Sequence, residues 1–115
     1  MDVEWIRKIC MSLPGVTEEI KWDNDLCFLV GSKMFCVTGL DKPSSLSFKV
    51  RDEEFVDLVS GTDFTPAPYL ARAKWVSLAP DARVKRTELE DYIRQSYELI
   101  MKKLSARAKK ELGIL

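Results

Sequence analysis

The sequence predicts an α+β domain in which an antiparallel sheet of about five strands carries helices on one face. Two short apolar runs separated by Gly31-Ser32 indicate a β-hairpin. Apolar residues recur at helical spacing near both ends of the chain. With 115 residues the chain has the length of one domain, so we assign residues 1–115 to a single domain. The predicted order of elements is α-β-β-β-β-α-β-α.

The first helix is expected to begin after Asp2, which is a suitable N-cap, and to run to about Met11. Pro14-Gly15 then stops it. Residues 16–22 read as a strand, and Asp23-Asn24-Asp25 as the turn that follows.

The hairpin strands are expected over 26–30 and 33–38, joined by a type II′ turn because glycine comes first in the turn. This register pairs Cys27 with Cys36. One face would carry Leu26, Phe28, Val30, Phe35 and Val37, and the other Cys27, Leu29, Met34 and Cys36. Because both faces are apolar, the second is either covered by another element or an interaction surface. A Cys27–Cys36 redox switch is conceivable, but we favour two reduced thiols.

The second half of the chain alternates loops with regular elements. In order, we expect a loop over 39–45, a strand over 46–50, a helix from Asp52 to Gly61, a loop over 62–68, a helical turn over 69–73, a strand over 74–78, a connection over 79–85, a long helix to about Leu104 and a short helix over 106–112. The spacing of Thr87 and Glu90 is that of a capping box at the start of the long helix.

The charges balance in total but not along the chain. Eighteen basic and eighteen acidic residues give a formal net charge of zero, which demands no polyanionic partner. Basic residues nevertheless gather in two stretches, Arg72 to Arg86 and Lys102 to Lys110, either of which can be a phosphate-binding surface or simply solvated. The candidate phosphate contacts are Arg72, Lys74, Arg83, Lys85 and Arg86, with Lys33 and Lys42 at hairpin or loop tips.

Catalytic signals are missing from the sequence. The chain contains no histidine and no glycine-rich phosphate loop, and its three cysteines lack the spacing of a disulfide framework or a zinc site. We therefore expect neither catalysis nor a metal or other cofactor. Without a signal peptide or a long apolar run, we expect a cytoplasmic protein that does not contact membranes. Trp22, Tyr69 and Trp75 could stack on bases, but we favour core positions for them. Tyr69 could instead lock its loop through a hydrogen bond to a backbone group.

Several short motifs resemble those of one protein family. They are Leu13-Pro14-Gly15-Val16-Thr17-Glu18-Glu19, Lys33-Met34-Phe35, Pro66-Ala67-Pro68-Tyr69-Leu70, Trp75-Val76 and Gln95-Ser96-Tyr97-Glu98-Leu99. With them, nearly the whole chain is similar to the MmcQ/YjbR family of small bacterial proteins. Lys74 stands before the Trp where the family commonly has His, so a role that needs an imidazole does not transfer.

The resemblance implies a fold like that of CyaY, the bacterial frataxin, and a DNA-binding function through hairpin wings. It does not carry iron chemistry with it, because fold does not imply function. The leading hypothesis is a small cytosolic module that contacts the backbone of double-stranded DNA through the basic residues named above. The rival is a module that binds a protein, a second copy of the chain or a small ligand on the apolar face formed by Cys27, Leu29, Met34 and Cys36.

Overall fold

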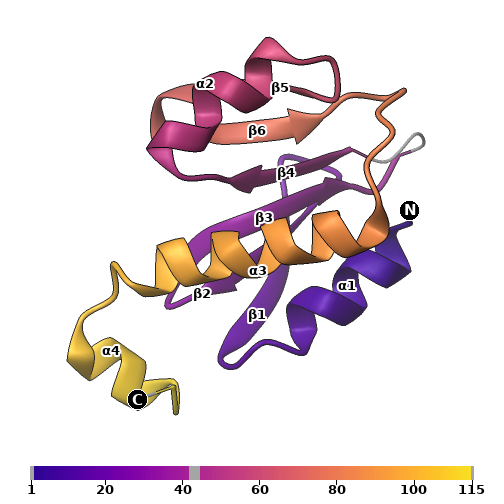
Figure 1. Cartoon of the computed structure of the whole chain (residues 1–115). Coiled ribbons are helices and arrows are strands. Elements are labelled where there is room, and N and C mark those ends of the chain that lie inside the picture. Colours follow the sequence, from indigo (N-terminus) through magenta and orange to yellow (C-terminus); the bar gives the residue numbers. More distant parts are fainter. Residues whose placement is uncertain (1, 42–44, 115) are drawn as a thin grey trace.

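The computed structural model describes residues 2–41 and 45–114, in which helices cover one face of an antiparallel sheet (Figure 1). The helices are α1 (Val3–Met11), α2 (Asp52–Ser60), the 3₁₀ turn η1 (Ala71–Ala73), α3 (Arg86–Met101) and α4 (Ala106–Glu111). The strands are β1 (Val16–Lys21), β2 (Asp25–Val30), β3 (Lys33–Gly39), β4 (Leu46–Lys49), β5 (Phe64–Pro66) and β6 (Trp75–Leu78). The predicted α+β class and the order of the predicted elements are confirmed.

The described residues form a sheet of six strands in the order β1-β2-β3-β4-β6-β5, in which all neighbours are antiparallel. The additional strand is β5, which lies in the segment 62–68 that was predicted to be a loop. Its three residues pair with β6 at the edge of the sheet. A run this short, with Pro66 at its end, is hard to distinguish from a loop by periodicity.

Side chains cap the starts of two helices, and for α1 this is the predicted N-cap. The Asp2 carboxylate accepts a hydrogen bond from the Trp5 N–H at 2.8 Å, and Ser105 caps α4 in the same way. The predicted capping box of Thr87 is wrong, because α3 begins at Arg86 and its first turn closes on the Lys85 carbonyl. Thr87 therefore lies inside the first turn.

The turn of the β2–β3 hairpin is type I′ and not type II′. Gly31 and Ser32 both have positive φ, +58° and +65°, whereas a type II′ turn needs this only at its first residue. The predicted register holds next to the turn, where Val30 pairs with Lys33 and Leu29 with Met34. A β-bulge follows, with Phe35 as the extra residue.

The bulge overturns the predicted faces of β3. Phe28 pairs with Cys36, and Cys27 pairs with Val37, so Cys27 and Cys36 are not opposite each other. Cys36 packs into the core under the helices, and Val37 points to the other face of the sheet. Because one residue of slippage reverses every side chain beyond it, the two residues have exchanged the faces predicted for them.

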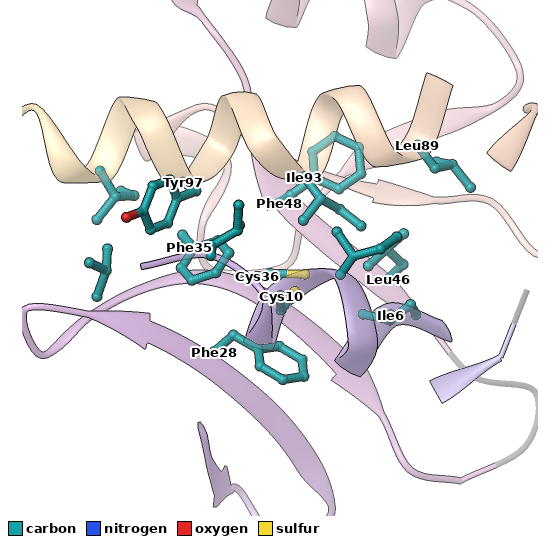
Figure 2. Packing of buried hydrophobic residues seen from close by; sticks show 14 of the residues in the cluster. Ile6, Cys10, Phe28, Phe35, Cys36, Leu46, Phe48, Leu89, Ile93 and Tyr97 are labelled. Atoms are coloured by element: carbon teal, nitrogen blue, oxygen red, sulfur yellow. The ribbon is translucent and has the colours of Figure 1, made fainter. Parts of the chain in front are cut away.

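The main core lies between the sheet and the helices α1, α2 and α3 (Figure 2). Phe35 meets Tyr97 edge to face with ring centroids 5.5 Å apart, and the Tyr97 hydroxyl donates to the Pro14 carbonyl at 2.6 Å. Phe48 stacks on Tyr92. These contacts fix α3 across the middle strands, so the helices leave only the opposite face of the sheet open.

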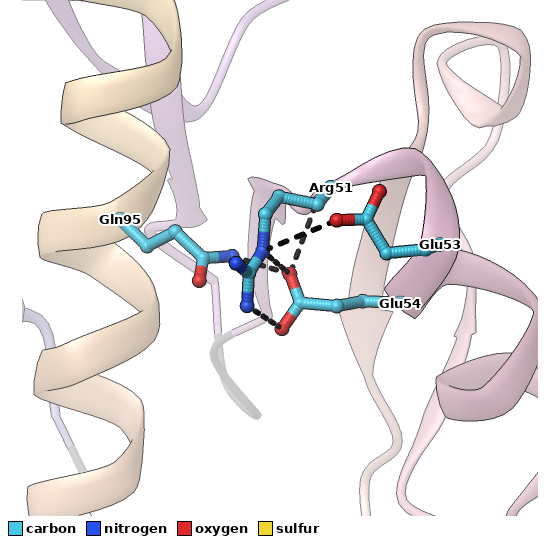
Figure 3. Close-up of polar contacts among 4 residues, drawn as sticks. All are labelled: Arg51, Glu53, Glu54 and Gln95. Carbon is cyan, nitrogen blue, oxygen red and sulfur yellow. Dashed lines mark hydrogen bonds and ion pairs between the residues drawn. The ribbon is translucent and has the colours of Figure 1, made fainter.

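A polar contact joins α2 to α3 (Figure 3). The Glu54 carboxylate accepts hydrogen bonds from the Arg51 backbone and side chain and, at 2.6 Å, from Gln95 of α3. Desolvation raises the pKa of Glu54, but the bonds from Arg51 and Gln95 outweigh it and lower the pKa overall. This network holds α2 in place and leaves Glu54 unavailable for chemistry elsewhere.

Candidate functional site

Three of the predicted phosphate contacts lie at one end of the sheet. β3 begins at Lys33, β4 ends at Lys49, and β6 begins directly after Lys74. Because β4 is antiparallel to both of its neighbours, β3 and β6, these three strand ends lie at the same end of the sheet. Arg72 lies in η1, immediately before this point in the chain. We call Lys33, Arg72, Lys74, Lys49 and Lys103 the basic end.

Lys49 lies at the centre of the basic end. Its ammonium group donates to the Ala73 carbonyl, and the residue is largely buried. Burial lowers the pKa of Lys49, and the positive charges of Lys103 and Lys74 lower it further, whereas Asp52 opposes them. The positive charges of Lys74 and Lys103 therefore lie close enough to the buried Lys49 to lower its pKa.

Lys74, another residue of the basic end, also has an internal partner. The Lys74 ammonium lies over the Phe55 ring, 5.1 Å from its centroid. Lys33 and Arg72 are exposed. Gly31, in the hairpin turn beside Lys33, lies against Leu104, which places this turn near the end of α3 and its Lys103.

The remaining predicted contacts lie elsewhere. Arg83 and Lys85 are exposed on the connection before α3, and Arg86 is its first residue. Arg86 stacks over Trp5 at 5.5 Å, and the Arg83 N–H donates to Asp63. The 16 residues of α3 span about 24 Å, so this group and Lys103 lie at opposite ends of the helix. Lys42 lies outside the described residues.

Two of the three aromatic residues predicted to be core are exposed. Trp75 is buried, with 4% of its surface exposed, as predicted. The prediction is wrong for Trp22, which is 64% exposed at the β1–β2 turn, and for Tyr69, which is fully exposed in the loop before η1. Both have positive φ, 48° and 66°, a conformation that non-glycine residues rarely adopt.

A groove with a volume of about 740 Å³ lies on the open face of the sheet, and both Trp22 and Tyr69 line it. Val37, Ser47, Ser77 and Thr65 also line it and form one continuous row of register partners across β3, β4, β6 and β5. The Ser47 and Ser77 hydroxyls are hydrogen-bonded to each other at 2.7 Å. Asp25 is the only charged residue among the groove's described lining residues. The volume falls within the range of about 300–1,000 Å³ typical of small-molecule sites.

The groove is continuous with a second, smaller apolar cluster. Cys27, Leu29 and Val37 of the hairpin pack there against Ala67 and Trp75, and Leu70 covers them. Of the two alternatives for the second face of the hairpin, cover by another element is therefore confirmed, and the face is not a free surface. Cys27 and Leu29 are buried, Met34 is half-buried against the cluster, and Cys36 lies on the opposite side of the sheet.

The cysteines are not poised as nucleophiles. Cys10, Cys27 and Cys36 are all buried free thiols. The Cys10 thiol and burial together raise the pKa of Cys36 well above its ordinary value, and burial raises the pKa of Cys27. Among residues 2–41 and 45–114, no three His, Cys, Asp or Glu side chains are grouped so as to hold a metal ion. No helix in this part of the chain is long and apolar enough to cross a membrane.

Sequence reasoning missed the groove because it depends on turn conformation. Trp22 is followed by Asp-Asn-Asp, and Tyr69 follows a proline, so each aromatic side chain lies in or beside a turn and not within a strand. Large apolar side chains in such segments are the signal that could have indicated exposure.

The fold and the groove define a small α+β domain with helices on one face of its sheet and an open, grooved face on the other. The sequence model of the YjbR family matches residues 11–99, and the chain belongs to this family. The resemblance found in the sequence motifs is thus confirmed. No curated protein matches the chain.

Two crystal structures share the fold. A Deinococcus radiodurans protein with a DUF419 domain is 30% identical to this chain, with a TM-score of 0.86 over 98% of this chain and 88% of its own. A Pseudomonas syringae protein is 14% identical, with a TM-score of 0.70 over 86% of this chain and 98% of its own. The second likeness shows the fold alone.

Proposed function

We propose that this chain is a small DNA-binding module that contacts the phosphate backbone through its basic end and is not an enzyme. The observation that carries this proposal is that Lys74 and Lys103 lie near the buried Lys49, whose pKa is lowered by burial and by these two charges, while Lys33 and Arg72 are exposed at the same end of the sheet. A phosphate group bound there would offset this repulsion and release counterions from the nucleic acid.

The proposed binding is weak and depends little on base sequence. A formal net charge of zero provides little long-range attraction, so contact relies on the local charge of the basic end. Contacts with phosphates also carry no direct sequence information. We expect a dissociation constant on the order of 10⁻⁴–10⁻⁶ M at physiological salt.

The same proposal places the protein in the cytoplasm, where its three free thiols would stay reduced. A protein partner or second copy of the chain is the rival occupant. To reach the apolar hairpin residues it would have to displace the segment 67–74, which covers Leu29 and Cys27. We therefore favour nucleic acid.

Two triple variants test the placement of the contacts. Replacing Lys33, Arg72 and Lys74 by Gln removes three positive charges from the basic end. Replacing Arg83, Lys85 and Arg86 by Gln removes three from the far end of α3, so both variants have the same net charge. Each is titrated against a fluorescently labelled 20-base-pair duplex at several salt concentrations.

The basic-end variant should bind more weakly for all sequences, and the slope of log affinity against log salt should fall by about 3. The matched variant should keep most of its affinity. Equal losses in the two variants would contradict the placement, because the effect would then follow net charge alone.

A further inference from the structure

We infer that the groove between Trp22 and Tyr69 binds an unpaired base, so that the preferred partner is single-stranded nucleic acid. This inference rests on the proposed nucleic-acid function and names its substrate class. Trp22 and Tyr69 lie in two separate turns, and both line one groove although neither is needed in the core.

The backbone fixes both aromatic residues in their exposed positions. The Trp22 carbonyl accepts a hydrogen bond from the Asn24 N–H at 2.9 Å, and the turn that contains Tyr69 is closed by the Leu70 N–H and the Ala67 carbonyl at 3.1 Å. Positive φ values at non-glycine residues are costly and cluster at binding sites, where the surrounding structure maintains them. The turns therefore hold two large aromatic side chains in water, where they lose the benefit of burial unless a ligand covers them.

The groove suits an uncharged planar ring better than a phosphate. Its floor includes the Ser47 and Ser77 hydroxyls, which are bonded to each other, so one of them can donate to a ligand and both can accept. The Asp25 carboxylate repels a phosphate but accepts hydrogen bonds from amino or imino groups on the edge of a base. Aromatic walls add stacking, which every base can use.

The basic end is close enough to hold the phosphates on either side of a bound base. Arg72 follows Tyr69 by three residues, which span at most about 11 Å. Lys49 follows Ser47 by two residues on the same strand, a rise of roughly 7 Å. A single strand can therefore place a base in the groove and its backbone at the basic end, whereas the bases of an intact duplex are stacked inside it.

The test measures the binding of a labelled 12-nucleotide single strand, the matching duplex, and a 12-mer with abasic sites at its centre. The proteins are the wild type, Trp22→Ala, Tyr69→Ala, Trp22→Phe and the control Ile20→Ala. Ile20 is 62% exposed on the same hairpin, but its side chain lies on the helix side of the sheet. Thermal melting first verifies that each variant is folded.

The inference predicts that the wild type binds the single strand more tightly than the duplex. Trp22→Ala and Tyr69→Ala should each weaken single-strand binding by about 5- to 150-fold, and the abasic strand should show a similar loss. The duplex affinity of these two variants should change less than about 2-fold, and so should the single-strand affinity of Ile20→Ala. Trp22→Phe should retain most of the single-strand affinity because it keeps a stacking ring.

If both alanine variants keep wild-type affinity while the basic-end variant loses it, the inference is wrong and the proposed function stands. If the wild type binds neither strand at low salt, the proposed function and the inference fall together. Equal affinity for the abasic and intact strands would also overturn the inference, since no base would then be bound.

Discussion

At the scale of single residues, Ser96 shows how one side chain fixes the geometry of the sheet. The ladder between β3 and β4 ends at the Cys36–Phe48 pair because of the bulge at Phe35. The buried Ser96 hydroxyl of α3 fills this gap by donating to the Phe35 carbonyl at 2.6 Å and accepting from the Lys49 N–H at 2.9 Å. The Ser96 side chain is therefore the link between α3 and the bulge.

Replacing Ser96 by Ala should destabilise the protein by about 2–4 kcal/mol, because two buried backbone groups lose their partner. Urea denaturation measures the change. Ser12→Ala is the matched control, since the Ser12 hydroxyl is exposed and donates only to the Ile9 carbonyl, and it should cost less than about 1 kcal/mol. Equal losses would show that Ser96 does not support the bulge.

At the scale of elements, the hairpin turn and the end of α3 depend on each other. A Cβ atom at Gly31 would lie 2.6 Å from the Leu104 Cδ2 atom, and φ there is +58°. Gly113 has a similar φ of +73° but open space around it. Comparing substitutions at Gly31 and Gly113 therefore separates two contributions to the loss of stability, the strained backbone conformation and the close contact with Leu104.

Gly31→Ala should therefore be at least about 1 kcal/mol more destabilising than Gly113→Ala, because overpacking adds to backbone strain. Chemical denaturation of the two variants gives the difference. Adding Leu104→Ala should make Gly31→Ala less costly than it is alone. The contact would play no part if the two glycine variants lost the same stability.

The segment 67–74 covers one face of the β2–β3 hairpin, so that face is not a free surface. It turns the apolar back of the hairpin into a second small core and leaves the groove beside it. Leu29→Glu should cost about 3 kcal/mol or more, because it buries an unpaired charge. Ile20→Glu, at an exposed position of the neighbouring strand β1, should change stability by less than about 1 kcal/mol. A folded Leu29→Glu protein of near-normal stability would restore the hairpin face as a free surface.

At the scale of the whole molecule, charge and shape mark two neighbouring parts of the structure. The basic end gathers positive charge where three strand ends meet, and the groove lies beside it with an uncharged floor. The net charge of zero hides this arrangement, because acidic residues offset the basic ones, among them Asp52 at the start of α2, beside Lys49. A local concentration of charge, rather than total charge, supports the proposed function.

The sequence was sufficient for the order of all elements except the short edge strand β5, because apolar periodicity, the Asp2 cap and the Gly31-Ser32 turn are local signals. It was not sufficient for the bulge at Phe35, since an alternation of apolar residues reads equally well in either register. The exposure of Trp22 and Tyr69 depends on turn conformation, and the gathering of Lys33 with Lys74 depends on strand order. Both are properties of the assembled sheet and not of a sequence window.

The most direct test of the central claim is the fluorescence anisotropy of labelled DNA, single-stranded and duplex, titrated with the wild-type protein at about 50 mM and 200 mM salt. The proposed function predicts binding in the micromolar range at low salt that weakens steeply at the higher concentration, with a slope that gives the number of phosphate contacts. No binding to either DNA at tens of micromolar protein, even at low salt, would contradict it.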